Sequence, residues 1–190
     1  MNQNLTEYLH RYIEITETEI KHFQSYLKPR SIKKKEFLLK SGKVCTSRYY
    51  IVNGCFKMFY FDDKANEQIL HFGIDNWWMT EYESLINKTP SKLNIQALED
   101  SELLELTDEN FKKVTKEIPE IYRMFMIIAE KTFIASQRRL SYMLSYSGEE
   151  LFRVFTSKNA AFCQRVPQYL IASYLGMTPE FFSKIRGRMK

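Results

Sequence analysis

The 190-residue sequence predicts an α+β protein with a small β-barrel or sandwich, a long helix and a C-terminal helix-turn-helix. Three observations predict this class. Short runs rich in β-branched and aromatic residues alternate with turns between Ser31 and Thr107. Apolar residues recur at spacings of three and four after Pro119. Two short apolar helices, separated by Gly176, fill residues 169–190.

Residues 5–27 precede the strands and predict two short helices. Apolar residues recur there at helical spacing, and Pro29 ends the pattern. Thr16 is a candidate N-cap because Glu19 follows three residues later, as a capping box requires.

The predicted strands are separated by turns of recognisable type. "NGC" at 53–55 predicts a tight primed hairpin turn, because Asn and Gly tolerate positive φ. "DDKAN" at 62–66 predicts a longer hairpin loop. "WWMTEYESLINK" at 77–88 predicts the end of a strand followed by a short helix. Its aromatic residues, expected in the core unless they line a ligand pocket, are Trp77, Trp78 and Tyr82.

A long helix is predicted over residues 118–148, with two phases of apolar residues. We expect one phase to cover the protein's own barrel and the other to meet the same helix of a second chain. A helix buried within a monomer is the alternative. Residues 148–158 predict a further helix, and residues 159–165 a loop. The first phase is Ile118, Ile121, Phe125, Ile128, Thr132, Ala135, Arg139, Tyr142 and Tyr146. The second phase is Tyr122, Met126, Ala129, Phe133, Ser136, Leu140 and Met143.

The terminal segment has the residue types of a helix-turn-helix. Ala172 is a small residue that lets a second helix pack closely across the first, and Gly176 accepts a left-handed backbone at the turn. Thr178 is a suitable N-cap for the second helix, with Pro179 in its first turn. The apolar residues expected to hold the two helices together are Ile171, Leu175, Met177, Phe182 and Ile185.

The second helix of this pair is predicted to enter a DNA major groove. Glu180 is suited to accept a hydrogen bond from cytosine, Lys184 to donate to guanine, and Phe181 to meet a thymine methyl group. Two alternatives stay open: Phe181 packs on its own domain, and Glu180 serves only the helix dipole. The residues predicted to face the bases are Thr178, Pro179, Glu180, Phe181, Ser183 and Lys184.

Charge supports a polyanion as partner. The chain carries a net charge of +5. From Leu151 to the end, seven Lys or Arg and one acid give +6, which leaves −1 for residues 1–150. A solvated charged terminus without a partner is the alternative. The residues suited to phosphate contacts are Arg186, Arg188 and Lys190.

The composition excludes several other classes. Cysteine and histidine are scattered without the spacing of a zinc or iron–sulfur site, so no metal and no cofactor are expected. The sequence contains no run of about 18 apolar residues, so no membrane span is predicted. The N-terminal stretch lacks the apolar core of a secretory signal, which favours a cytoplasmic protein. Because no catalytic motif stands out, we expect no enzyme.

The order of barrel, long helix and helix-turn-helix resembles the Crp/Fnr family of bacterial transcription regulators across nearly the whole chain. The residues that carry the resemblance are "YLIASYLGMTPEFFSKIR" at 169–186, "RYYIVNGCFKMFY" at 48–60 and "LNIQALEDSELLEL" at 93–106. The family often has Glu-x-x-Ser-Arg in its recognition helix. Lys184 stands in place of that Arg, and because Lys lacks the planar fork, base preference is expected to be altered or looser. With the chain stopping at Lys190, we expect no β-wing.

The β-roll of the resembled family binds cyclic nucleotide through a Gly-Glu pair and, ten residues after that Glu, an Arg followed by Ser or Thr. Thr80-Glu81 matches the first pair, and Ser91-Lys92 falls at the second. The resemblance therefore makes Glu81, Ser91 and Lys92 candidate ligand residues. Because the phosphate-pairing Arg is missing, we expect that cyclic AMP is not the effector.

The resemblance predicts a jelly-roll-like β-roll domain with N-terminal helices at residues 1–117, a dimerisation helix at 118–148 and a helix-turn-helix domain at 149–190. It implies a homodimeric transcription regulator that binds pseudo-palindromic double-stranded DNA through a recognition helix at about 178–187. An unknown small-molecule effector and RNA polymerase are candidate partners. The alternative is a small-molecule sensor that acts through protein contacts.

Overall fold

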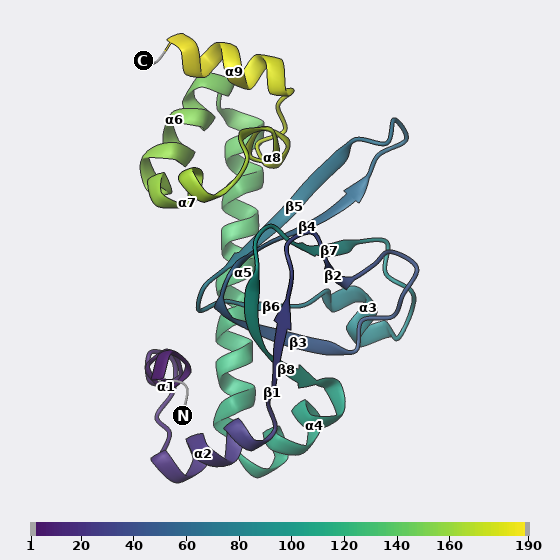
Figure 1. The fold of residues 1–190 in the computed structure, drawn as a ribbon. Helices are drawn as coiled ribbons and strands as arrows, with labels where there is room; N and C mark the ends of the chain where they lie inside the picture. Colours follow the sequence, from purple (N-terminus) through teal and green to yellow (C-terminus); the bar gives the residue numbers. More distant parts are fainter. Residues whose placement is uncertain (1–2, 189–190) are drawn as a thin grey trace. The chain divides into compact units, whose positions relative to one another are not determined.

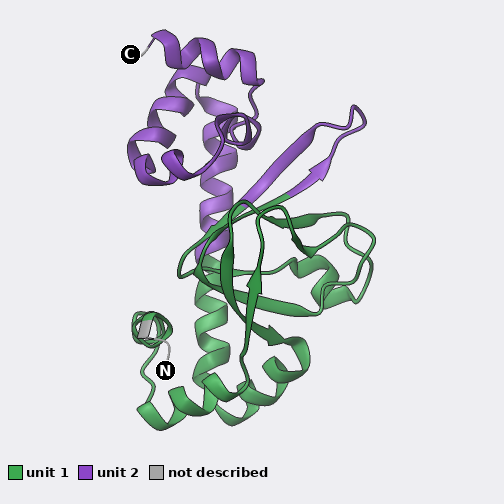
Figure 2. Ribbon diagram, in the orientation of Figure 1, with its two compact units in different colours: residues 1–58, 72–130 green, residues 59–71, 131–190 purple. Residues whose placement is uncertain are grey.

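The computed structural model describes residues 3–188 and divides into two compact units (Figure 2). One unit contains residues 1–58 and 72–130, and the other contains residues 59–71 and 131–190. The helix Pro119–Ser145 (α5) and the strands Cys55–Phe61 (β4) and Glu67–Ile74 (β5) have residues in both. The three predicted domains, 1–117, 118–148 and 149–190, stay a prediction.

The first unit is an α+β structure, as predicted (Figure 1). Two elements, β1 and α4, were not expected from the sequence, because residues 28–32 and 108–117 contain few apolar residues. Its strands, besides parts of β4 and β5, are β1 (Lys28–Ile32), β2 (Phe37–Leu39), β3 (Ser47–Asn53), β6 (Trp78–Met79), β7 (Asn94–Ala97) and β8 (Ser101–Thr107). Its helices, besides the first part of α5, are α1 (Gln3–His10), α2 (Glu17–Ser25), α3 (Tyr82–Asn87) and α4 (Asp108–Glu117).

The strands form two four-stranded sheets of a β-roll. One sheet has the order β1-β8-β3-β6 and the other the order β2-β7-β4-β5, so β5 lies at a sheet edge. In the first sheet β8 pairs antiparallel with both β1 and β3. Side chains from the facing sheets, such as Ile51, Phe56 and Ile95, are fully buried between them and form the core of the roll.

The predicted hairpin at 53–55 is wrong. β3 and β4 flank Gly54 but belong to different sheets, so the chain passes from one sheet to the other at this glycine. Gly54 has φ +145° and donates its N–H to Asp75, and a Cβ here would lie 2.2 Å from the Ser101 hydroxyl. A close approach between segments, not a primed turn, therefore requires this glycine.

The two other turn predictions are confirmed. The loop 62–66 joins β4 to β5, and residues 77–88 form β6 followed by α3. Of the aromatic residues in that stretch, Trp78 packs against the core, with its ring centroid 4.7 Å from that of Phe125. Trp77 and Tyr82 were expected in the core but are 45% and 39% exposed.

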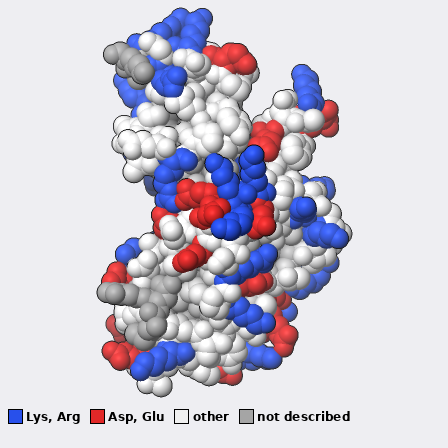
Figure 3. All heavy atoms as spheres, in the orientation of Figure 1, with Lys and Arg blue, Asp and Glu red and all other residues white. Residues whose placement is uncertain are grey.

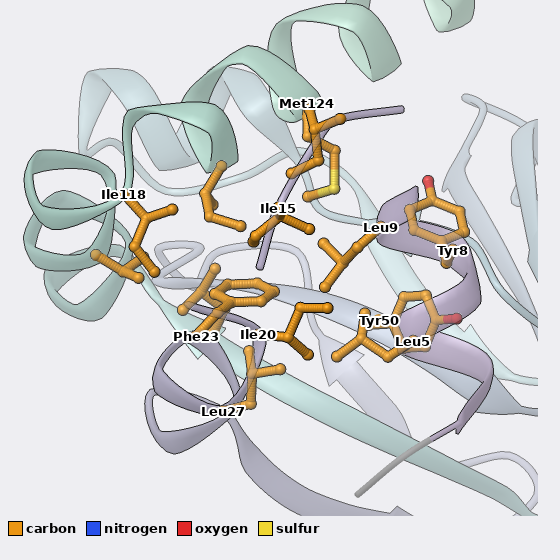
Figure 4. Close-up of a cluster of buried hydrophobic side chains, with 14 of the residues drawn as sticks. Leu5, Tyr8, Leu9, Ile15, Ile20, Phe23, Leu27, Tyr50, Ile118 and Met124 are labelled. Atoms are coloured by element: carbon orange, nitrogen blue, oxygen red, sulfur yellow. The ribbon is translucent and has the colours of Figure 1, made fainter. Parts of the chain in front are cut away.

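The N-terminal helices pack on one another and on the roll. Both halves of the predicted capping box are present: the Glu19 N–H donates to the Thr16 hydroxyl, and the Glu19 carboxylate accepts from the Thr16 N–H at 2.9 Å. Buried side chains of α1 and α2, such as Leu9 and Phe23, meet Ile118 and Met124 in one cluster (Figure 4). The start of α5 is thereby fixed in the core of this unit.

The predicted long helix is α5. The two predicted phases of apolar residues are confirmed near the start of this helix. Ile121 and Phe125 of the first phase are buried, whereas Tyr122 and Met126 of the second phase are 53% and 44% exposed. Further along, Phe133 and Leu140 of the second phase are 63% and 58% exposed. An apolar stripe therefore runs uncovered along the helix.

Asp108 joins three segments of the first unit. Its carboxylate accepts hydrogen bonds from Arg48 at 3.2 Å, Lys88 at 2.7 Å and Lys112 at 3.0 Å. Arg48 is itself buried, with its guanidinium 3.6 Å from the centroid of the Phe111 ring. Burial acts to raise the pKa of Asp108, but the three cations outweigh it and lower that pKa to about 2.

The second unit, apart from the β4–β5 residues 59–71, is helical. Residues 159–165 were predicted as a loop, but most of them form a helix, because Phe162 packs against Phe155 with ring centroids 6.1 Å apart. The helices, besides the end of α5, are α6 (Gly148–Lys158), α7 (Ala160–Arg165), α8 (Gln168–Tyr174) and α9 (Pro179–Arg188).

We expect Asp108→Asn to lower the free energy of unfolding at pH 7 by about 1–2 kcal/mol, because partial exposure weakens the ion pairs. The folded-state pKa of Asp108 is depressed, so its contribution is present above the unfolded pKa of about 4 and is lost as the pH falls towards 2. Urea unfolding of both proteins at pH 7, 4 and about 2.5 measures this.

Glu109→Gln is the control, because Glu109 is exposed and pairs only along its own helix with Lys113 in the contacts described. A stability gap between Asp108→Asn and the unaltered protein that stays constant from pH 7 to about 2.5 would contradict the assigned role of the Asp108 carboxylate.

Candidate nucleic-acid interface

The turn between α8 and α9 ends the first helix sharply. Gly176 has φ +70°, its N–H donates to the Ser173 carbonyl at 3.0 Å, and the Met177 N–H donates to the Ala172 carbonyl at 2.9 Å. These two bonds form a Schellman motif, which caps α8 and reverses the chain. The left-handed residue is the glycine that the sequence predicted.

α9 begins directly after this turn. The Thr178 hydroxyl accepts from the Phe181 N–H at 3.2 Å, so Thr178 is the N-cap, and Pro179 is the first helical residue. Capping places Thr178 and the residues after it at an exposed helix start.

Apolar contacts hold α9 across the helices before it. Ala172 is fully buried, as a small residue at a helix crossing must be, and Ile185 is 1% exposed. Phe182 is also buried, and its ring centroid lies 5.0 Å from that of Phe152 on α6. The order helix, glycine turn and crossing helix is that of a helix-turn-helix.

Most residues predicted to face the bases lie on the outer side of α9. This exposed surface, which we call the reading face, consists of Thr178, Pro179, Glu180, Ser183 and Lys184. Phe181 is 48% exposed, but its ring lies against α6, where a Cβ on Gly148 would be 2.4 Å from it. The packing of Phe181 on its own unit, one of the two alternatives, therefore has direct support.

The predicted phosphate-contacting residues extend from the end of α9. Arg186 donates to the Gln168 amide oxygen, and Arg188 pairs with Glu149 at 3.1 Å. Both Arg188 and Glu149 are more than half exposed, so this pair is weak and exchanges readily. Basic side chains gather over the C-terminal helix on the face shown in Figure 3. Lys190 lies outside the described residues.

The candidate ligand residues of the roll are engaged within the protein. Both oxygens of the buried Glu81 carboxylate cap α3, accepting from the N–H groups of Glu83 at 2.8 Å and Ser84 at 3.0 Å. The neighbouring Thr80 hydroxyl donates to the Ser47 carbonyl at 2.9 Å. Glu81 is therefore only 6% exposed, and each of its oxygens already accepts one backbone hydrogen bond.

Ser91 and Lys92 differ in their surroundings. Ser91 is buried, and its hydroxyl accepts from the Leu93 N–H at 2.9 Å. Lys92 is exposed, so it does not point into the roll. Glu81 and Ser91 are thus hydrogen-bonded within the protein and Lys92 is exposed, and their role as ligand residues stays a prediction.

Comparison with known proteins agrees with this architecture. Residues 29–117 match the family model of the cyclic nucleotide-binding domain. The transcriptional activator protein Anr of Pseudomonas protegens is 24% identical over 178 residues, covering 85% of this chain and 70% of its own. In both sequence and architecture the chain is similar to transcription regulators of the Crp/Fnr family.

Solved structures support this fold. The c-di-GMP-responsive global regulator CLP of Xanthomonas campestris superimposes with a TM-score of 0.77 at 14% identity, over 92% of this chain and 91% of CLP. A protein from Eubacterium rectale assigned to the Crp/Fnr family gives a TM-score of 0.71 at 15% identity, over 94% and 87%. The likeness therefore extends to both the roll and the terminal helices.

Sequence reasoning missed two polar residues beside the helix-turn-helix. Ser173 lies on α8, and Arg139, placed only as a member of an apolar phase, lies on α5. Both hydrogen-bond to the backbone of β5. No local pattern marks such residues, because their partners are far away in the sequence.

We expect cyclic AMP not to bind, and therefore to change the melting temperature by less than about 1 °C. A ligand stabilises a protein only if it binds the folded state. Glu81→Gln is expected to cost about 1 kcal/mol through the weakened cap of α3. Thermal melts with and without 1 mM nucleotide, roughly 1,000-fold above a micromolar dissociation constant, measure both effects. Glu83→Gln is the control on the same turn. A nucleotide-dependent rise that Glu81→Gln abolishes would contradict this prediction.

Proposed function

We propose that two copies of this chain bind a pseudo-palindromic site on double-stranded DNA and regulate transcription from it. The reading face of α9 carries this proposal, because it leaves polar side chains exposed at the start of a helix that crosses a buried partner helix. Each copy would place α9 in a major groove, with the two half-sites about 34 Å apart. Regulators of this family bind DNA as dimers, which favours this function over a sensor acting through protein contacts.

The second phase of α5 supports the dimer. The apolar residues of this phase recur every three or four positions and form a stripe that is uncovered. Such a stripe is suited to pack against the same helix of a second copy. Symmetric pairing of the two helices would also supply the two-fold axis that a pseudo-palindromic site requires.

The remaining partners follow from this function. Access to DNA assigns the protein to the cytoplasm, and a regulator at a promoter would meet RNA polymerase. No described helix is long and apolar enough to cross a membrane. The effector, if it is a small molecule, would be recognised by groups other than Glu81, whose carboxylate caps α3.

Selection of bound DNA from a random pool, followed by mobility-shift titration, tests the function. We expect a two-fold symmetric consensus and an affinity that falls about tenfold or more between 50 and 200 mM salt, because phosphate contacts release counterions. Lys184→Ala is expected to weaken binding by about 1–3 kcal/mol and to relax specificity at one base pair. Lys158→Ala on α6 is the matched control. Equal binding to all sequences would contradict the proposal.

Leu140→Asp is expected to convert the dimer to monomer, because it places a charge in the middle of the apolar stripe. DNA affinity should then drop by about 10²-fold or more, since only one half-site remains bound. Arg138→Asp puts the same acid on another side of the helix and should leave the dimer intact. Analytical ultracentrifugation and the same titration measure both. A dimer that survives Leu140→Asp would argue against this interface.

A further inference from the structure

The tip of the β4–β5 hairpin is a preformed element of the second unit. Asp62 organises it: one carboxylate oxygen accepts from the N–H groups of Lys64 and Asn66, each at 2.9 Å, and the other accepts from the Gln68 amide at 2.8 Å. These bonds, led by that from the Asn66 backbone, lower the pKa of Asp62. The tip therefore keeps its shape without help from a partner.

One edge of this hairpin is hydrogen-bonded to the helix-turn-helix. β5 is an edge strand, whose backbone groups would otherwise be open to pairing. The Ser173 hydroxyl of α8 donates to the Glu67 carbonyl at 2.7 Å and accepts from the Ile69 N–H at 3.0 Å. The Ser173 side chain thus satisfies backbone groups of β5 that a neighbouring strand would otherwise pair with.

Arg139 makes a second bridge at the same edge. Its guanidinium donates to the carbonyl of Leu70 at 2.8 Å and to that of Tyr174, the last residue of α8. It also stacks on the Tyr174 ring, 3.9 Å from the centroid. Two independent bridges, from Ser173 and Arg139, therefore hold β5 against α8.

The held hairpin lies beside the start of the recognition helix. A cavity of about 720 Å³ is lined on one side by residues 65–68 of the hairpin and on the other by residues 176–180 of the turn and α9. From Asp62 to Gln68 the tip carries three acids and one base. An acidic loop next to the reading face would repel the phosphates that α9 must approach.

We propose that the β4–β5 hairpin is an autoinhibitory latch, closed by Ser173 and Arg139, which must release α8 before the reading face can dock on DNA. This inference rests on the proposed function. The closed latch reduces the fraction of chains that are competent to bind DNA. The apparent affinity for DNA is then the intrinsic affinity multiplied by that competent fraction. A hairpin that instead docks on DNA as a wing is the competing outcome, which the acidic tip disfavours.

Ser173→Ala tests the latch, because it deletes both bonds to β5 and leaves the reading face unchanged. We expect about three- to tenfold tighter binding to the selected DNA. The Ile69 amide should exchange its hydrogen faster in this variant, and also in the unaltered protein when DNA saturates it. Ser157→Ala is the matched control, because its hydroxyl bonds to the carbonyl of Val154 in its own helix.

Asp63→Asn provides a second variant that alters only charge at the exposed tip. It should tighten DNA binding by about two- to fivefold at 50 mM salt and by less at 300 mM, because salt screens the repulsion. Arg139→Gln should act in the same direction as Ser173→Ala.

Three results would overturn the latch. Unchanged or weaker DNA binding by Ser173→Ala is the first, and unchanged Ile69 exchange in that variant is the second. The third is slower hydrogen exchange of the Ile69 amide when DNA is bound. That result would indicate that the hairpin docks on DNA as a wing. If neither the unaltered protein nor any variant bound DNA, that result would instead overturn the proposed function, and the autoinhibitory latch with it.

Discussion

A single helix with two apolar faces is the constraint on which this protein depends. Ile121 and Phe125 of α5 are buried in the core of the first unit, whereas Phe133 and Leu140 lie on a stripe that is more than half exposed. Exposed apolar surface of this extent is costly in water unless another surface covers it. In the proposed dimer, covering that stripe would bring together two helix-turn-helix segments suited to a symmetric site.

The reading face depends on a few backbone details. Ala172 admits the crossing helix, and Gly176 reverses the chain at φ +70° with both bonds of a Schellman motif. A larger residue at the first position would separate the helices, and a β-carbon at the second would strain the turn. The orientation of Ser183 and Lys184 therefore follows from positions outside the reading face.

The roll keeps its fold while its candidate ligand residues serve the protein itself. Glu81 caps α3, and Ser91 closes a local turn with Leu93. Burying a carboxylate is costly unless hydrogen bonds satisfy it, and here two backbone N–H groups do so. The match to a cyclic nucleotide-binding domain thus describes the architecture of residues 29–117.

The sequence by itself determined the features whose partners are a few residues apart. The Thr16–Glu19 capping box, the loop 62–66 and the Gly176 turn all formed as predicted, since short-range hydrogen bonds depend on local backbone geometry. The two phases of α5 were also visible, because helical periodicity places residues on faces whatever those faces meet.

Only the tertiary structure decided which distant segments meet. Gly54 looked like a hairpin glycine but faces Ser101 at a crossing between sheets, and the cap that Glu81 provides for α3 was not predicted. Ser173 gave no signal, although it joins α8 to β5. Such partners depend on which surfaces are buried together, and that choice reflects the packing of the whole chain rather than the preference of any one segment.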